Sequence, residues 1–293
     1  MAGSLRNGTA GVRLVEVNFV VLGKAAAYGS LMTKLFGIIG DPIEQVRSPE
    51  VFNRLFKERA VDAFMAPMLV SPENFEAALT GLRGIDNVAG LIITVPHKAA
   101  AARLMKSGSG RATLAQAANA LRPCMDGWAG DLFDGEGFVL GIEAEERAVR
   151  GVRCALVGCG GAGTAIAFAL LERRVASLSI WDIDREKSDA LAERLRAMRR
   201  AKVSIGLPDE TTDIAINATP LGMKESDPMP IAVDSLRTDA IVADVIMKPP
   251  CTRLLLEAKR RGCAVHAGRH MLEHQVDSIW TFFNLPRAIG RTR

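Results

Sequence analysis

A glycine-rich turn between a predicted strand and a predicted helix constrains the fold of this chain more than any other segment. Residues 158–163 read Gly-Cys-Gly-Gly-Ala-Gly. The mostly apolar run 151–157 before them predicts a buried strand, and the apolar run 164–171 after them predicts a helix. A second predicted strand, 177–181, ends at Asp182. This order of strand, turn, helix, strand and acid is typical of the unit that binds a dinucleotide.

The glycines of the turn have separate physical roles. Gly158 permits the tight bend, Gly160 lets the backbone approach a pyrophosphate, and Gly163 lets the helix pack closely on the strand. The start of the helix adds free N–H groups and the positive end of the helix dipole, which favour phosphate. Close packing alone also selects glycine, but the complete unit favours binding. We therefore predict cofactor contacts from Gly158, Gly160, Gly161, Ala162, Gly163 and Asp182.

Asp182 also indicates which dinucleotide is bound. A carboxylate there accepts hydrogen bonds from the ribose hydroxyls of NAD and repels the 2′-phosphate of NADP. Asp184 adds a second negative charge, whereas Arg185 is the one residue that favours NADP. The simpler interpretation is that Asp184 and Arg185 are solvated charges that open the next helix. We expect NAD as the cofactor, with NADP as the alternative.

Length, charge and cysteine usage limit the remaining possibilities. A chain of 293 residues is long for one hydrophobic core, so we expect two domains. Its 37 basic and 33 acidic residues are spread along the chain, and the basic stretch 194–202 alternates with apolar residues as a solvated helix face does. We expect no nucleic-acid partner and no membrane partner. Five cysteines without a C-x-x-C pair fit a reducing cytoplasm.

The first 32 residues differ from the rest of the chain. The apolar run 15–22 contains Glu16 and Asn18, is too short to span a bilayer, and lacks the pattern of a signal peptide. We expect residues 1–32 to form an N-terminal extension, either disordered or upstream of a translation start at Met32. We assign this segment no function.

Predicted strands alternate with predicted helices from residue 35 onward. The strands are 35–39, 63–69, 88–93, 151–157, 177–181, 214–217, 241–245 and 264–266, and the helices include 49–59, 72–82, 99–105, 164–171 and 271–283. Such alternation predicts mostly parallel sheets covered by helices. We expect an α/β fold of two domains, an N-terminal α/β substrate domain and a Rossmann-type dinucleotide-binding domain. The glycine- and acid-rich stretch 127–137 is predicted to be the loop between them.

Two polar stretches are candidates for chemistry. Thr94 to Lys98 read Thr-Val-Pro-His-Lys and directly follow an apolar strand, at the edge where ligands bind to a parallel sheet. A partly desolvated lysine there would exchange protons near neutral pH, although a surface lysine that opens a helix explains the stretch equally well. Residues 130–138 carry three carboxylates, which suit a hydroxyl-rich substrate or a divalent cation, but their spacing is not that of a calcium loop.

After residue 32 the chain resembles the shikimate dehydrogenase family, through motifs that occur in order across both predicted domains. They are Gly40 to Ile43 with Ser48-Pro49 and Asn53, Thr94 to Lys98, Asn119, Asp134 to Phe138, the glycine turn, Ile216 to Met223, Asp244 to Pro249 with Thr252, and Gly268, Met271-Leu272 and Gln275. The resemblance implies reversible NAD(P)-linked oxidation of shikimate to 3-dehydroshikimate, within aromatic amino acid biosynthesis. It implies Lys98 and Asp134 as the catalytic pair, substrate contacts from Ser48, Thr94, Asn119 and Gln275, and further cofactor contacts from Asn217, Thr219, Pro220 and Gly268.

The implied pair makes physical sense. Oxidation of a secondary alcohol needs a base for the hydroxyl proton while hydride leaves to the nicotinamide. Lys98 would take that proton, and Asp134 would orient both the lysine and the hydroxyl. We expect residues 33–136, completed by 268–293, to form the substrate-binding domain and 137–267 the NAD(P)-binding domain, with the active site between them.

Several positions depart from the family pattern. They are Val46 for a serine, Phe52 for a histidine, Ala120 for a threonine, Leu132-Phe133 for Asn-Thr, and Met247 for a tyrosine. A carboxylate that loses a partner in a site costs roughly 1–3 kcal/mol. Either Arg47 takes over the substrate carboxylate, or the substrate is quinate, an aminoshikimate-type analogue or another cyclic hydroxy acid. The resemblance is therefore to a divergent, shikimate-dehydrogenase-like subgroup.

Two other classes of protein stay open. His270 to His274 match the H-x-x-E-H pattern of zinc hydrolases, and His266 lies four residues earlier. Such a site needs a carboxylate ligand downstream, where Asp277 is the only acid, so we expect no metal. A non-catalytic dinucleotide-binding protein would keep the glycine turn without needing Lys98 or Asp134. We expect a small-molecule cyclic hydroxy acid as ligand, and a monomer or homodimer.

Overall fold

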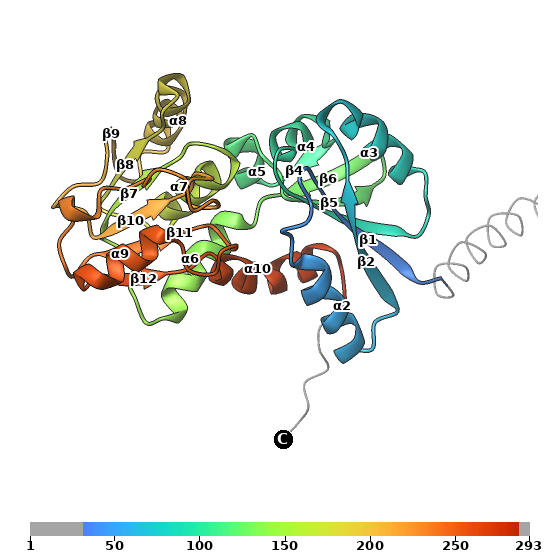
Figure 1. Ribbon diagram of the computed structural model, residues 1–293. Coiled ribbons are helices and arrows are strands. Elements are labelled where there is room, and N and C mark those ends of the chain that lie inside the picture. The colour runs from blue at the N-terminus through green and yellow to red at the C-terminus, as the bar shows by residue number, and fades with distance from the viewer. Residues whose placement is uncertain (1–31, 287–293) are drawn as a thin grey trace, which may run out of the picture.

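Two six-stranded sheets, each covered by helices, build the protein (Figure 1). The structure is a computed structural model that describes residues 32–286, so the predicted extension over 1–32 lies outside it except for Met32. The strands of the first sheet lie within residues 34–131 and those of the second within 153–266. The predicted α/β fold, with an N-terminal α/β part and a Rossmann-type part, is confirmed.

The first sheet has the strand order β2-β1-β3-β5-β6-β4. Its strands are β1 (Lys34–Gly40), β2 (Ala63–Leu69), β3 (Val88–Ile93), β4 (Ser107–Gly108), β5 (Ala120–Cys124) and β6 (Gly127–Asp131), and its helices are α2 (Ser48–Glu58), α3 (Phe75–Arg83), α4 (Lys98–Leu104) and α5 (Gly110–Ala115). β1 runs parallel to β2 and β3, whereas β5 is antiparallel to β3 and β6. The carboxyl ends of β1 and β3 therefore meet at one edge, where the polar residues around Thr94 begin.

The predicted loop over 127–137 was wrong, because this stretch forms strand β6 and the start of helix α6 (Asp134–Ala144). Its glycines suggested a turn, but they serve close packing. A Cβ added at Gly135 would overlap the carbonyl oxygen of Ala165 in the neighbouring helix α7 (Gly161–Glu172). The boundary predicted between residues 136 and 137 thus falls inside α6.

The second sheet is parallel throughout, with the order β12-β11-β10-β7-β8-β9. Its strands are β7 (Arg153–Val157), β8 (Ser177–Trp181), β9 (Lys202–Ile205), β10 (Ile214–Asn217), β11 (Ile241–Asp244) and β12 (Ala264–His266), and its further helices are α8 (Arg185–Ala197) and α9 (Arg253–Arg261). This is the order of the doubly wound dinucleotide-binding fold. Its strand order reverses between β7 and β10, which is where such folds bind ligands.

Helix α10 (Arg269–Phe282) returns from the second sheet to the first and lies between them (Figure 1). Its apolar side chains, among them Trp280, pack into the core of the first sheet. Phe52 belongs to this core: it is fully buried, with its ring centroid 6.5 Å from that of Trp280. Burial of one such ring contributes about 1.5–3 kcal/mol, so position 52 serves packing in this chain.

Within residues 32–286, none of the helices combines the length and the apolar character needed to cross a membrane.

Candidate functional site

A lysine and an aspartate from different elements form a buried ion pair. Lys98 begins α4 directly after the loop that follows β3, and Asp134 begins α6. The Lys98 Nζ lies 2.6 Å from Asp134 Oδ2, and the two side chains are only 11% and 5% exposed. The structure therefore brings the two predicted catalytic side chains into direct contact.

Asn119 connects this pair to α10. Its Nδ2 donates to Asp134 Oδ1 and to Gln275 Oε1, both at 3.0 Å, while its Oδ1 accepts from the Phe133 N–H at 2.8 Å. Both oxygens of Asp134 thus have a donor, and the whole network is buried. The network therefore joins four predicted site residues from separate parts of the chain. They are Lys98, Asn119, Asp134 and Gln275.

The two predicted hydroxyl contacts lie at the carboxyl edge of β1 and β3. Ser48 is buried at the start of α2, and Thr94 follows β3, with its N–H bonded to the carbonyl of Ile39. Neither hydroxyl hydrogen-bonds to another residue of the described range, so both are available to a ligand. Arg47, which was one of the two alternatives for the substrate carboxylate, forms a bidentate pair with Glu50 on the surface at the start of α2.

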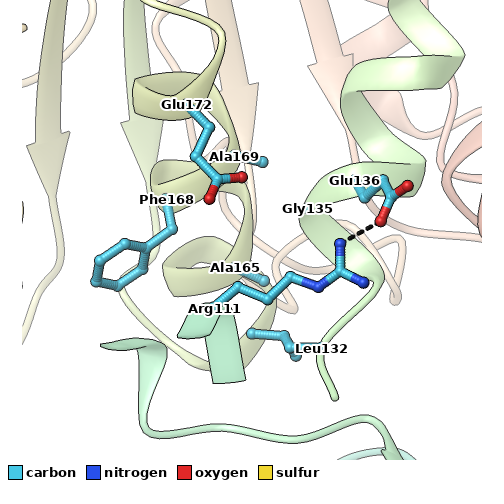
Figure 2. A pocket seen from close by; sticks show the side chains of 8 residues that line it. All are labelled: Arg111, Leu132, Gly135, Glu136, Ala165, Phe168, Ala169 and Glu172. Carbon is cyan, nitrogen blue, oxygen red and sulfur yellow. Dashed lines mark hydrogen bonds and ion pairs between the residues drawn. The ribbon is translucent and has the colours of Figure 1, made fainter. Parts of the chain in front are cut away.

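The other two carboxylates of the acid-rich stretch are bound by Arg111, which the sequence analysis did not single out. Arg111 pairs with Asp131 at 2.7 Å and with Glu136, and its guanidinium lies 4.4 Å from the ring centroid of Phe133. Figure 2 shows the small pocket beside this arginine, between α5, α6 and α7. Arg111 thus engages Asp131 and Glu136, whereas Asp134 is engaged by Lys98 and Asn119. Arg111 gave no sequence signal because its partners lie 20 and 25 residues away.

The glycine turn has the geometry that its predicted roles require. Gly158 adopts φ +103°, and a Cβ added at Gly163 would overlap the Gly158 carbonyl oxygen. At Gly160, which caps α7, an added Cβ meets nothing within 4 Å. The backbone at Gly160 thus borders open space, as a turn that a pyrophosphate approaches requires. Binding of a dinucleotide there stays a prediction.

The ion pair and the glycine turn are adjacent. A Cβ added at Gly161 would lie 3.3 Å from the Cδ of Lys98 and 3.6 Å from its Cβ, so the lysine stem lies along the start of α7. A ligand bound at the glycine turn and a ligand bound at the lysine head would therefore be neighbours, although the turn belongs to the second sheet and Lys98 to the first.

Asp182 hydrogen-bonds to the backbone of the glycine turn and of the segment that follows β8. Its Oδ2 accepts from the Cys159 N–H at 2.7 Å, and its Oδ1 accepts from the Asp184 N–H at 2.9 Å. No positive side chain pairs with Asp182 within the described residues. Arg185 instead lies near Asp189 on its own helix, 90% exposed.

The predicted contacts after β10 have a structural role in this conformation. The Asn217 side chain is fully buried, accepts from the Thr219 N–H and hydroxyl, and donates to Leu221 O and Asp244 Oδ1. Its polar atoms therefore shape the loop that continues into Pro220. Gly268, before α10, is needed for packing, because an added Cβ would overlap the Val245 carbonyl oxygen.

Cys159 of the turn is expected to be unreactive despite its place in the site. Burial raises the pKa of its thiol to about 11, so roughly one molecule in a thousand carries the thiolate at pH 8. Iodoacetamide at pH 8 should modify exposed Cys251 and spare Cys159, as read by peptide mass spectrometry, with Cys251→Ser as the control. Stoichiometric labelling of Cys159 in the folded protein would contradict the burial seen here.

Known proteins resemble the chain over both sheets. A family model described as the shikimate dehydrogenase substrate binding domain matches residues 38–121. A shikimate dehydrogenase (NADP(+)) of Methanopyrus kandleri is 32% identical over 273 residues, which cover 88% of this chain and 94% of that protein.

Solved structures also resemble the chain over most of its length. A shikimate 5-dehydrogenase from Listeria monocytogenes, in complex with shikimate and NAD, superposes with a TM-score of 0.78 at 26% identity, covering 86% of this chain and 92% of that one. A ligand-free 5-ketofructose reductase from a Gluconobacter strain superposes with a TM-score of 0.77 at 26% identity, covering 86% and 93%. Both cover the two sheets together.

Proposed function

Because the chain belongs to the shikimate dehydrogenase family, and is therefore an NAD(P)-dependent oxidoreductase, we propose that Lys98 and Asp134 are its catalytic pair. The observation that carries this proposal is the 2.6 Å contact between the two side chains, beside Gly161 of the glycine turn. A sensor that only binds a dinucleotide would not need such a buried pair.

The proposed mechanism assigns each side chain one task. Lys98 in its neutral amine form accepts the proton of the substrate hydroxyl, and Asp134 holds the lysine head and balances the positive charge of the ammonium that results. Asn119 keeps Asp134 in place from its other oxygen. A bound nicotinamide supplies the hydride acceptor, held through the turn at the start of α7.

We propose shikimate as the substrate, with quinate or another cyclic hydroxy acid as the alternative. The free hydroxyls of Ser48 and Thr94 and the amide of Gln275 are suited to a polyhydroxylated acid, whereas Val46 offers no polar group. Initial rates with shikimate and with quinate test this directly. Turnover of shikimate supports the proposal; binding of the dinucleotide without turnover of either acid would assign the site to a different cyclic substrate.

The preference for NAD is a further proposal, and it runs against the NADP(+) in the names of curated relatives. It rests on the Asp182 carboxylate, which forms no ion pair with a lysine or arginine within residues 32–286 and would repel a 2′-phosphate. We expect kcat/KM to be at least about tenfold higher with NAD than with NADP, equivalent to about 1.4 kcal/mol.

Substitution of the carboxylate tests this preference. Asp182→Asn should reduce the ratio of the two kcat/KM values, while Asp189→Asn, on the exposed face of α8, should leave it unchanged. A wild-type kcat/KM that is higher with NADP would refute the proposed role of Asp182.

We further propose that residues 33–136 with 268–293 bind the substrate and that 137–267 bind the cofactor. Support comes from α10, whose buried side chains join the core of the first sheet. The five cysteines are all free, which supports a reducing cytoplasm as the working compartment.

A further inference from the structure

Three side chains that can bind metal meet where α6, β12 and α10 join. Glu145 follows the last residue of α6, His266 ends β12, and His270 lies in the first turn of α10. One ligand atom from each lies within 4.8 Å of the other two. Glu145 Oε1 is 3.4 Å from His266 Nδ1 and 3.4 Å from His270 Nε2.

These separations suit a shared cation better than direct hydrogen bonds. Zinc binds imidazole nitrogen and carboxylate oxygen at about 2.0–2.2 Å in a tetrahedral arrangement, which places neighbouring ligand atoms roughly 3.4 Å apart. Both distances from Glu145 already have that value. The two imidazole nitrogens are at most 4.8 Å apart, so they would need to approach by at most roughly 1.4 Å to bind the same ion.

The cluster is also incompletely bonded. His266 is 1% exposed, and neither of its ring nitrogens has a hydrogen-bond partner among the described residues. Leaving such a group unpaired is costly, and a cation would satisfy it.

The surroundings orient the ligands. Glu273 Oε2 lies 3.6 Å from His270 Nδ1, on the side of the ring away from Glu145. Arg147 pairs with Glu145 Oε2 at 3.0 Å, so Oε1 is the oxygen that faces the rings. A Cβ added at Gly141 would lie 3.2 Å from His266 Nε2, so the glycine makes room for the ring.

We propose that Glu145, His266 and His270 bind one divalent transition-metal ion, with zinc the best match to two imidazoles and a carboxylate. Water completes the coordination. The eleven-residue helix α6 separates Glu145 from Asp134 by about 16 Å, so the ion is structural and takes no part in the reaction. It joins the end of α6 to the junction of β12 and α10.

This site differs from the H-x-x-E-H pattern in the sequence. The prediction of no metal considered only acids downstream of His274, whereas the carboxylate ligand comes from upstream. The histidines that meet are His266 and His270, rather than His270 and His274.

Calorimetric titration of the chelator-treated full-length protein with zinc chloride tests the proposal. We expect one equivalent bound with a Kd of about 1 μM or lower, and a higher Tm with the ion present. Glu145→Gln and His270→Gln should each weaken binding at least about tenfold. The Glu145 and His270 side chains are partly exposed, so these two variants should fold. A substitution of buried His266 would disrupt folding and is therefore not used.

The matched control is His274→Gln, one turn further along α10 and outside the cluster, which should bind zinc as the wild type does. Folding of every variant is checked by circular dichroism. Absence of stoichiometric binding, or a folded His270→Gln protein with wild-type affinity, would overturn the proposal.

Discussion

Replacing Lys98 with alanine is expected to lower kcat by roughly 10²–10⁴-fold, the usual contribution of a positioned general base or acid. Without Lys98, the proposed proton acceptor for the substrate hydroxyl next to Asp134 is missing. The Kd for the dinucleotide should change little, because the aliphatic stem of the lysine, and not its charged head, lies nearest to Gly161. Initial rates at saturating substrate and cofactor, together with dinucleotide titration, measure both quantities.

The control for this variant must separate chemistry from folding. Removing one partner of a buried ion pair costs about 3–5 kcal/mol, so Tm and circular dichroism accompany the rates. Asp134→Asn should give a similar loss of kcat, and Lys57→Ala, an exposed lysine of α2, should give none. A folded Lys98→Ala protein that turns over within a fewfold of the wild type would remove Lys98 from the mechanism.

Gly163→Ala is expected to cost roughly 3 kcal/mol of stability and to abolish measurable dinucleotide binding. The new methyl group would overlap the carbonyl oxygen of Gly158, and neither backbone segment can move without displacing β7 or α7. Chemical denaturation of the protein without cofactor, followed by dinucleotide titration, measures the two effects.

Gly160→Ala is the matched variant in the same turn. Its Cβ would meet nothing in the protein and its φ of −73° is ordinary, so stability should stay within about 0.5 kcal/mol of the wild type. The same methyl group would stand where a pyrophosphate approaches, so the Kd for the dinucleotide should rise. Unchanged dinucleotide affinity in Gly160→Ala would show that the phosphates bind elsewhere.

Local sequence signals predicted the parts of the fold that apolar runs define. The bounds of β2, β3, β8, β10 and β12 agree with the predicted strands residue for residue. The hairpin of β5 and β6 was missed because Pro123, Gly127 and Gly130 read as turn residues. Helix α6 was missed because its glycines reflect contact with α7, which depends on the tertiary fold.

The candidate site was only partly accessible to sequence reasoning. The glycine turn could be predicted from its flanking strand and helix, and the pairing of Lys98 with Asp134 came from the family resemblance. Their link through Asn119 to Gln275 spans 156 residues, so no local pattern encodes it. Phe52 stood out as a lost polar contact, yet its ring fills the core beside Trp280. The contacts of Arg111 and Glu145 could not be predicted from the sequence, because their partners are distant along the chain and only the tertiary fold brings them together.

The position of α6 between its neighbours determines which part of the site can open. Its Gly135 lies against the backbone of α7, and its Gly137 lies against the backbone of α10. A rotation of one sheet relative to the other would therefore pivot about this helix. Asp134 begins this helix and contacts both Lys98 and Asn119, so these three side chains would move together in such a rotation. The separation that would change is the one between Lys98 and Gly161, so such a rotation would alter access to the proposed cofactor site and leave the proposed catalytic pair intact.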